Sequence, residues 1–302
     1  MRWLLLSIGL LWGCASAPPP VPSPALGLAW TAVDSLRQPG VEVWAGRSDA
    51  FPLRTWAVRL DDVPLRVLLA ADTTDRRDGP TTFAQRTGAC VVLNGGYFSM
   101  ATGEVVGLAT VDGEILSPAT SEVERDNVRY PVTRGAVGIG PRGVEIEWAG
   151  EPMTRCEAPS DNRPGRPGTA TSCSAWPVSE AISAGPMLLR NGRPTKSADA
   201  EAFFGTGIPQ RNPRSAIGVD SDGRVWLVVV DGRQPDSRGV TLPELAALMA
   251  ALGARDALNL DGGGSSAMVV RSGEALVRLN RPTGYDVERE VATALGAFCD
   301  GT

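Results

Sequence analysis

Glycine and proline recur along the whole chain, with 35 glycines and 24 prolines among 302 residues and no repeating period. Proline removes a backbone donor and glycine weakens helix interiors, so both residues concentrate in turns. This frequency favours short strands joined by turns over a helical bundle. With 43% of its residues apolar, the chain can bury one large core or two modest ones.

The chain contains no histidine. This absence excludes Ser-His-Asp and Cys-His nucleophile systems, imidazole bases and zinc sites that need imidazole ligands. Any chemistry must then use carboxylates, guanidinium groups, hydroxyls, amides or the backbone. The net charge of -5 and the lack of a clustered basic run indicate that nucleic acid is not a partner.

The N-terminus has the layout of an export signal. Residues 1–14 place Arg2 before an apolar run that is too short to span a bilayer and that ends at Cys14. The sequence LWGC at residues 11–14 resembles a bacterial lipoprotein box, which predicts lipidation of Cys14. Cleavage after the small residues 15–17 is the alternative, and it would release a soluble secreted protein.

We therefore expect a lipoprotein-type signal peptide over residues 1–14, a proline-rich linker over 15–27 and one domain over 28–302. No acidic retention signal follows Cys14. This favours an exported outer-membrane lipoprotein whose only membrane contact is the lipid anchor.

Four further cysteines remain in a chain that is expected to be exported, namely Cys90, Cys156, Cys173 and Cys299. Disulfides are therefore predicted, and three pairings are possible. A bridge between Cys156 and Cys173 would pin the loop-like stretch between them, and Cys90 would then pair with Cys299. Buried free thiols are the alternative. Metal binding is disfavoured because no CxxC spacing occurs.

Several short strands and two helices are predicted. Alternating apolar and polar residues between 30 and 71 indicate strands, and the apolar runs at 89–93, 225–230 and 257–260 indicate strands buried on both faces. Helices are predicted over 82–87 and 241–252, the second with Thr241 and Glu244 as a capping box. Residues 151–177 resemble a loop, and Asn191-Gly192 a hairpin turn.

The strand, helix, strand order over residues 225–260 predicts a right-handed crossover, which would bring Asp231 and Asp261 to the same sheet edge. We therefore expect an α+β fold, with one mixed-sheet domain and helices packed on the sheet.

One glycine-rich motif directly follows an apolar strand: Asp261-Gly262-Gly263-Gly264-Ser265-Ser266. Its glycines allow backbone N–H groups to turn toward a ligand and form an anion-binding nest beside a carboxylate and two hydroxyls. A glycine-rich hairpin or bulge is the alternative. Neither a Walker loop nor a dinucleotide fingerprint fits, because no Gly-Lys-Ser/Thr follows and the next element is a strand.

Polar residues also mark three other strand ends. The strand at 89–93 runs into Asn94-Gly95-Gly96-Tyr97-Phe98, whose rings could stack on a sugar or anchor a sharp turn in the core. Arg211 and Arg214 precede an apolar strand and could bind phosphate, or be solvated surface charges. The strand at 225–230 ends in Asp231-Gly232-Arg233.

The segments NGGYF, RSAIG, VVDGR and LNLDGGGSSAMVV occur in this order and resemble those of the phosphodiester glycosidase family. The likeness spans about residues 60–298 and includes residues 185–188 and 288–295. It implies an α+β fold and a hydrolase that cleaves the glycosidic C–O bond of a sugar-1-phosphodiester, such as an N-acetylglucosamine-1-phosphodiester. It does not fix the substrate.

A departing phosphate monoester is a weak base, so the site needs one carboxylate near the anomeric carbon and cations or N–H groups for phosphate. We assign Asp261 as the leading catalytic carboxylate, Asp231 as the second, and Arg214 and Arg233 as phosphate ligands. The other candidates for substrate binding are Asn94, Gly95, Gly96, Tyr97, Gly262, Gly263, Gly264, Ser265, Ser266 and Glu288.

No cofactor is firmly implied, although Asp231 and Asp261 could hold a divalent cation together with hydroxyl or carbonyl oxygens. Two other functions stay open. One is a non-catalytic envelope module that binds phosphorylated glycans, and the other is a phosphodiesterase that cleaves the P–O bond.

Overall fold

The computed structural model describes residues 25–71, 74–159, 168–284 and 286–299. The predicted signal peptide, the Cys14 lipidation site and most of the proline-rich linker therefore lie outside the described residues. Within those ranges, no helix is both long and apolar enough to cross a bilayer.

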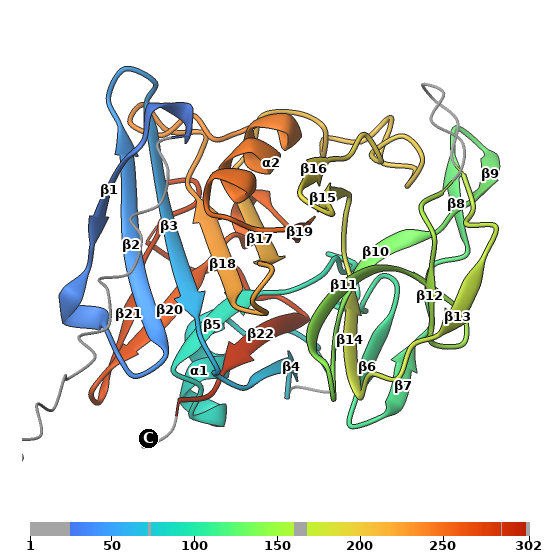
Figure 1. Cartoon of the computed structure of the whole chain (residues 1–302), viewed down its shortest axis with the longest axis horizontal. Coiled ribbons are helices and arrows are strands. Elements are labelled where there is room, and N and C mark those ends of the chain that lie inside the picture. Colours follow the sequence, from blue (N-terminus) through green and yellow to red (C-terminus); the bar gives the residue numbers. More distant parts are fainter. Residues whose placement is uncertain (1–24, 72–73, 160–167, 285, 300–302) are drawn as a thin grey trace, which may run out of the picture.

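The largest sheet has eight strands and runs from the left edge to the centre of Figure 1. In spatial order the strands are β1 (Ala29–Ala32), β2 (Val41–Ser48), β3 (Leu53–Leu60), β18 (Val225–Val230), β17 (Arg214–Val219), β19 (Asp256–Asn259), β15 (Met187–Arg190) and β16 (Arg193–Pro194). The two-residue turn at Asn191-Gly192 joins β15 to β16, which confirms the predicted hairpin.

A second sheet of five strands packs against the first. In spatial order its strands are β21 (Ala275–Arg278), β20 (Met268–Ser272), β5 (Val91–Asn94), β22 (Thr293–Ala297) and β4 (Leu65–Leu69). Leu227 of β18 and Val91 of β5 belong to the same buried apolar cluster, so the inner faces of the two sheets share one core.

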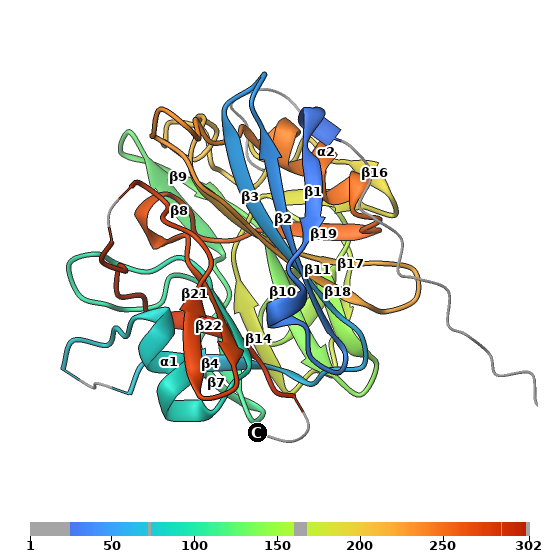
Figure 2. The ribbon, with the colours of Figure 1, turned by 90° about the vertical axis from the view of Figure 1, so that its left-hand side faces the viewer.

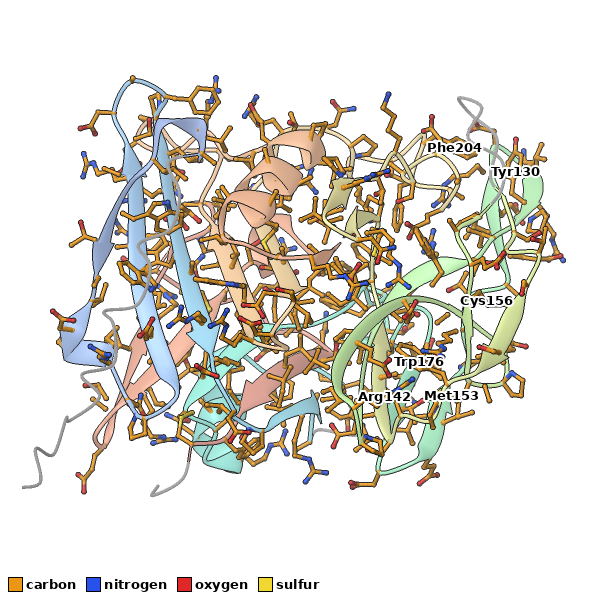
Figure 3. All side chains as sticks on the ribbon, in the orientation of Figure 1. Tyr130, Arg142, Met153, Cys156, Trp176 and Phe204 are labelled. Atoms are coloured by element: carbon orange, nitrogen blue, oxygen red, sulfur yellow. A yellow bond between two sulfur atoms is a disulfide. The ribbon has the colours of Figure 1, made fainter. Side chains whose placement is uncertain are left out.

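A third sheet of seven strands lies on the right-hand side of Figure 1. Its strands are β13 (Cys173–Ala175), β12 (Thr154–Cys156), β11 (Gly143–Gly150), β10 (Arg134–Gly140), β14 (Glu180–Ser183), β6 (Ala109–Val111) and β7 (Glu114–Ser117). Val137 of β10 joins the core of the other two sheets. The separate hairpin β8 (Glu122–Arg125) and β9 (Val128–Pro131) contacts residue Phe204 through Tyr130, with ring centroids 5.5 Å apart (Figure 3).

Two α-helices cover outer sheet faces on opposite sides of the molecule (Figure 2). The helix α1 (Pro80–Thr87) contacts the five-stranded sheet, and α2 (Leu242–Ala251) contacts the eight-stranded sheet. In α2 the predicted capping box is confirmed, because Thr241 and Glu244 exchange side-chain to backbone hydrogen bonds. Gly253 follows the helix with a φ of 92°, a conformation that glycine adopts without strain.

The predicted α+β fold with helices on a mixed sheet is wrong. The structure is 43% strand and 10% helix, and the strand pairs of its described residues are antiparallel. The helix α2 does connect β18 to β19, but these strands are not neighbours because β17 lies between them and pairs antiparallel with both. A local strand, helix, strand pattern cannot show a third strand inserted between its two ends.

The stretch 151–177, predicted as a loop, contributes structure to the third sheet. It contains β12 and β13 and, next to its last residue, Trp176, which is 3% exposed. Trp176 packs on Gly138 and belongs to a separate apolar core that also contacts Met153, and both side chains are labelled in Figure 3. The alternating strand signal is weak here because each strand is only three residues long.

Both predicted disulfides are confirmed. Cys90 beside β5 bonds to Cys299 near the C-terminus, and Cys156 on β12 bonds to Cys173 on the adjacent strand β13. The first bridge closes a loop of 209 residues and the second a loop of 17 residues.

We predict that the longer loop makes the first bridge the more stabilising one. Replacing Cys90 and Cys299 by alanine should lower the free energy of unfolding by about 5 kcal/mol, and replacing Cys156 and Cys173 by about 3 kcal/mol, because a longer closed loop restricts the unfolded chain more. Urea unfolding of the two double variants measures this difference. An equal or larger loss from the Cys156–Cys173 pair would contradict it.

Candidate active site

Four strand ends from two sheets meet at one place. In the eight-stranded sheet, Arg214 pairs with Val230 and Ala216 with Asn259, so the start of β17 lies beside the ends of β18 and β19. This confirms that the strands leading to Asp231 and Asp261 end at the same edge. The strand β5 joins them from the five-stranded sheet, because the Asp261 N–H donates to the Gly95 carbonyl at 3.1 Å.

A pocket of about 310 Å³ opens at this edge, at the lower end of the volumes of small-molecule sites. It is lined by Tyr97, Gly207, Ile208, Gln210, Asn212, Arg214, Arg233, Asp261, Gly262, Gly263, Gly264 and Arg289. The described lining residues therefore include three arginines and one carboxylate. This excess of positive charge favours an anionic ligand.

Asp261 is the carboxylate of the pocket and is half-buried. Burial raises the pKa of its carboxyl to about 6, although the Ser265 hydroxyl, a 2.9 Å hydrogen bond from the Gly262 N–H and the charge of Arg289 all favour the ionised form. Asp261 is therefore ionised at neutral pH, and it is a stronger base than an exposed aspartate.

The three glycines after Asp261 form a tight turn, which includes the short 3-10 segment Gly263–Ser265. Gly263 has a φ of 62°, and a Cβ on Gly264 would lie 2.5 Å from Nη2 of Arg289. Glycine thus lets the arginine side chain approach the backbone of the turn. Ser265 and Ser266 are buried behind the turn. The Ser265 hydroxyl lies close enough to the Asp261 carboxylate to favour its ionised form, whereas the Ser266 hydroxyl has no hydrogen-bond partner among the described residues.

Arg233 and Arg289 both approach this glycine turn, Arg233 at Gly263 and Arg289 at Gly264. A Cβ on Gly263 would lie 3.4 Å from Nη2 of Arg233, and this nitrogen donates to Oδ1 of Asn212 at 2.6 Å. The ion pairs among the described residues include neither guanidinium group, unlike the neighbouring Arg211, which binds Glu244. Both groups can therefore bind an external anion.

Arg289 was not among the site residues predicted from the sequence. It stands between Glu288 and Glu290, a pattern that is typical of a solvated surface segment. Its only sequence signal is its place in the closing segment of the family resemblance, because its contact with the glycine turn joins residues far apart in the chain.

Arg214 and Tyr97 form the inner wall of the pocket. Arg214 is 2% exposed, and its Nη2 donates to the carbonyls of Ile208 and Gln210 at 2.5 Å each. Burial lowers the pKa of Arg214 to about 10, which leaves it a cation at neutral pH. Tyr97 donates its hydroxyl to the Gly185 carbonyl at 2.7 Å, and burial raises the pKa of this hydroxyl, so it stays neutral.

Asn94 lies beneath the site and not in the pocket. Its side chain is fully buried and donates to the Asp261 carbonyl at 2.7 Å. Its Oδ1 accepts from the Ser215 hydroxyl at 2.6 Å and from the Ala267 N–H at 3.2 Å. Asn94 therefore fastens the loop that carries Asp261 to β5 and β17.

Gly95 and Gly96 are also packed in the interior. A Cβ on Gly95 would lie 2.4 Å from Oγ1 of Thr293, and one on Gly96 would lie 2.2 Å from the Ser183 carbonyl oxygen. Both glycines permit the close approach of neighbouring strands, and neither lines the pocket.

Asp231 does not line the pocket either. Its carboxylate is fully buried, 3.2 Å from Nη2 of Arg54, and it accepts from Nδ2 of Asn280 at 3.1 Å and from the Arg281 N–H at 3.0 Å. Burial raises its pKa to about 6. These contacts place Asp231 as an anchor for the loop around residues 280–281, apart from Asp261.

Glu288 lies on the other side of its chain segment from Arg289. It binds Thr81 of α1 and lines a neighbouring hollow of about 670 Å³. The structure therefore places Glu288 outside the pocket.

Glu201 is a buried carboxylate that was not among the residues predicted from the sequence. It accepts from the N–H groups of Gly135 and Met187 at 2.9 Å each and from Nε1 of Trp148 at 3.1 Å. Burial raises its pKa. These contacts connect the seven-stranded sheet to β15 just behind Gly185, the hydrogen-bond acceptor of Tyr97. A lone glutamate in an apolar segment gives no sequence signal for this position.

Three hollows are larger than this pocket, at about 710, 670 and 370 Å³. Each contains an arginine that is paired with a carboxylate: Arg76 with Glu104 in the first, Arg281 with Asp286 in the second and Arg59 with Glu42 in the third. Since their cations have carboxylate partners, these hollows are less suited to an anion than the smaller pocket at the strand ends.

Among the described residues, no group of three or more cysteine, aspartate or glutamate side chains could hold a metal ion. The carboxylate of Asp231 is engaged by Arg54, Asn280 and the Arg281 N–H, whereas Asp261 faces the pocket. A divalent cation shared by the two carboxylates stays a prediction.

The comparison with protein families agrees with this geometry. The sequence profile described as phosphodiester glycosidase matches residues 87–298, which is well over half of the chain. The chain therefore belongs to the phosphodiester glycosidase family.

Similar named proteins include N-acetylglucosamine-1-phosphodiester alpha-N-acetylglucosaminidases. The Bos taurus protein is 28% identical over 228 residues, which cover 72% of this chain and 37% of the relative. The Homo sapiens protein is 28% identical over 257 residues, which cover 84% and 45%. The chain thus spans less than half the length of these relatives.

Two solved structures share the fold at 20% sequence identity. A hypothetical protein from Synechocystis has a TM-score of 0.60 and covers 94% of this chain and 64% of its own. The zebrafish N-acetylglucosamine-1-phosphodiester alpha-N-acetylglucosaminidase catalytic domain, auto-inhibited by its pro-peptide, has a TM-score of 0.58 and covers 90% and 82%.

We predict that Asn94 supports the site through stability. Asn94→Ala should lower the free energy of unfolding by about 2–4 kcal/mol, because it leaves buried partners on three segments without hydrogen bonds. The matched control Arg233→Ala removes an exposed side chain and should change this energy by less than about 0.5 kcal/mol. Urea unfolding measures both; wild-type stability in Asn94→Ala would disprove this role.

Proposed function

We propose that this chain is a hydrolase that cleaves the glycosidic C–O bond of a sugar-1-phosphodiester and releases the sugar and a phosphomonoester. The observation that carries the proposal is the pocket, whose lining residues include three arginines, a glycine turn and one carboxylate. Membership of the phosphodiester glycosidase family supports this bond type. An N-acetylglucosamine-1-phosphodiester is the first substrate to test, since two relatives are named for it.

The phosphate of the substrate would lie at the glycine turn, between Arg233 and Arg289, with Arg214 behind it. A phosphodiester carries one negative charge. Together with Asp261 it brings two negative charges to a pocket with three positive ones. The bound complex is therefore close to electrically balanced, and planar guanidinium groups suit the phosphate oxygens.

Hydrolysis then needs only one carboxylate. A water molecule attacks the anomeric carbon and passes a proton to Asp261, while the C–O bond breaks and its electron pair stays on the phosphate oxygen. The arginines stabilise the charge that develops on this oxygen. A phosphate monoester has a second pKa near about 6, so it departs without the protonation that a sugar alkoxide requires.

The presence of only one carboxylate among the described lining residues disfavours the alternative function of a phosphodiesterase. Enzymes that attack phosphorus commonly use two metal ions, and this pocket has one carboxylate among its described lining residues. The non-catalytic glycan-binding module remains the second candidate, because the cationic pocket alone would suffice for binding.

We also propose that the chain is exported. The two disulfides support this, since such bonds persist in oxidising compartments. The lipid anchor at Cys14 stays a prediction, which metabolic labelling with a radioactive fatty acid would test.

We predict that Asp261→Asn lowers turnover of an N-acetylglucosamine-1-phosphodiester by at least about a thousandfold, because the general base is lost. In oxygen-18-labelled water, the wild type should place the label in the sugar. Label in the phosphate would show P–O cleavage instead. Substrate binding without any turnover in the wild type would favour the binding module.

The pH dependence follows from the raised pKa of Asp261. The ionised form is the base, so kcat/KM should rise with pH through about 6 and then level off. Asp231, whose pKa is raised to a similar value, provides the control: Asp231→Asn should keep this rise because its carboxylate lies outside the pocket. A rate that falls as pH increases through 6 would assign Asp261 the role of an acid.

A further inference from the structure

The chain segment at residues 286–290, here called the strap, passes over the start of helix α1. Glu288 in its middle accepts two hydrogen bonds from Thr81, from the backbone N–H at 3.0 Å and from the hydroxyl at 2.6 Å. Thr81 is the second residue of α1, and the cap residue Gly79 has no side chain to bind its free N–H groups. Glu288 therefore caps α1 from 207 residues away.

A second attachment follows directly. The N–H of Val291 donates to the Asp78 carbonyl at 2.9 Å, and the Asp78 N–H donates back at 3.0 Å. The strap is thus fixed to the first turn of α1 through Glu288, and Val291, the residue that follows the strap, is fixed to Asp78 just before α1. Arg289 lies between these two attachments, and its guanidinium reaches the backbone of Gly264.

Arg289 itself is exposed, and its guanidinium forms no hydrogen bond or ion pair with the described residues, although the charge of Asp261 attracts it. The position of the Arg289 guanidinium at the turn therefore depends on the backbone of the strap, which the capping bonds of Glu288 hold on the N-terminal side of Arg289.

We propose that Glu288 is a positioning residue that acts through Arg289: by capping α1 it holds the strap so that the Arg289 guanidinium meets the phosphate of the ligand at the glycine turn. This inference rests on the proposed function for the phosphate alone and not on the cleavage step. It reassigns Glu288 from contact with the substrate to support of a residue that makes that contact.

The sign of the effect separates this role from simple electrostatics. Glu288 carries a negative charge and directly precedes Arg289, the residue that would bind the phosphate. Removal of this negative charge alone would therefore strengthen phosphate binding. The capping role requires the opposite. Glu288→Ala should weaken the affinity for inorganic phosphate about tenfold, as measured by calorimetry, and raise KM for the diester by the same factor with little change in kcat.

Three further variants test whether the hydrogen bonds of Glu288, and not its charge, support phosphate binding. Glu288→Gln should recover most of the lost affinity, because its amide can accept from the Thr81 N–H and donate to the Thr81 hydroxyl. Thr81→Val removes only the hydroxyl bond and should weaken binding about threefold. Glu290→Ala, the matched control, removes the same charge on the other side of Arg289 and should not weaken binding.

The double variant Glu288→Ala, Arg289→Ala should bind phosphate no more weakly than Arg289→Ala alone, since both changes remove one contact. Full additivity, or unchanged or tighter phosphate binding in Glu288→Ala, would overturn the proposal. If phosphate binding follows this pattern but no diester is hydrolysed, the positioning role stands and the proposed hydrolase activity fails.

Discussion

The buried amide of Asn94 is the interaction on which the site depends. The pocket is assembled from the ends of strands in two different sheets, and packing of apolar residues between sheets does not fix the position of a loop at their edge. Asn94 does so, because its amide binds the Asp261 carbonyl, the Ser215 hydroxyl and the Ala267 N–H together. Moving this buried amide would break all three hydrogen bonds, so Asn94 holds the Asp261 loop in a fixed position.

Asp231 and Asp261 have similar pKa values, but their different surroundings give them different roles. Burial raises the pKa of both Asp231 and Asp261 to about 6. Asp231 is surrounded by Arg54, Asn280 and the Arg281 N–H, so its charge is used to hold the structure. Asp261 faces a pocket whose arginines lack carboxylate partners among the described residues. This pairing of one available base with several available cations matches a substrate whose leaving group is already an anion.

Local signals in the sequence predicted much of the framework and part of the site. The capping box of α2, the Asn191-Gly192 turn and the strand ends before Asp231 and Asp261 depend on neighbouring residues, and all are confirmed. The antiparallel insertion of β17, the capping of α1 by Glu288 and the contact of Arg289 with Gly264 join distant segments. For the same reason, sequence could place Asn94 and Asp231 near the site but could not show that their side chains point away from the pocket.

A crystal structure of Asp261→Asn with an uncleaved sugar-1-phosphodiester tests the central claim most directly. The phosphate should lie at the glycine turn within hydrogen-bond distance of Arg233 and Arg289, with the anomeric carbon facing position 261. A phosphate bound in the hollow beside Thr81, or a sugar turned away from position 261, would contradict it.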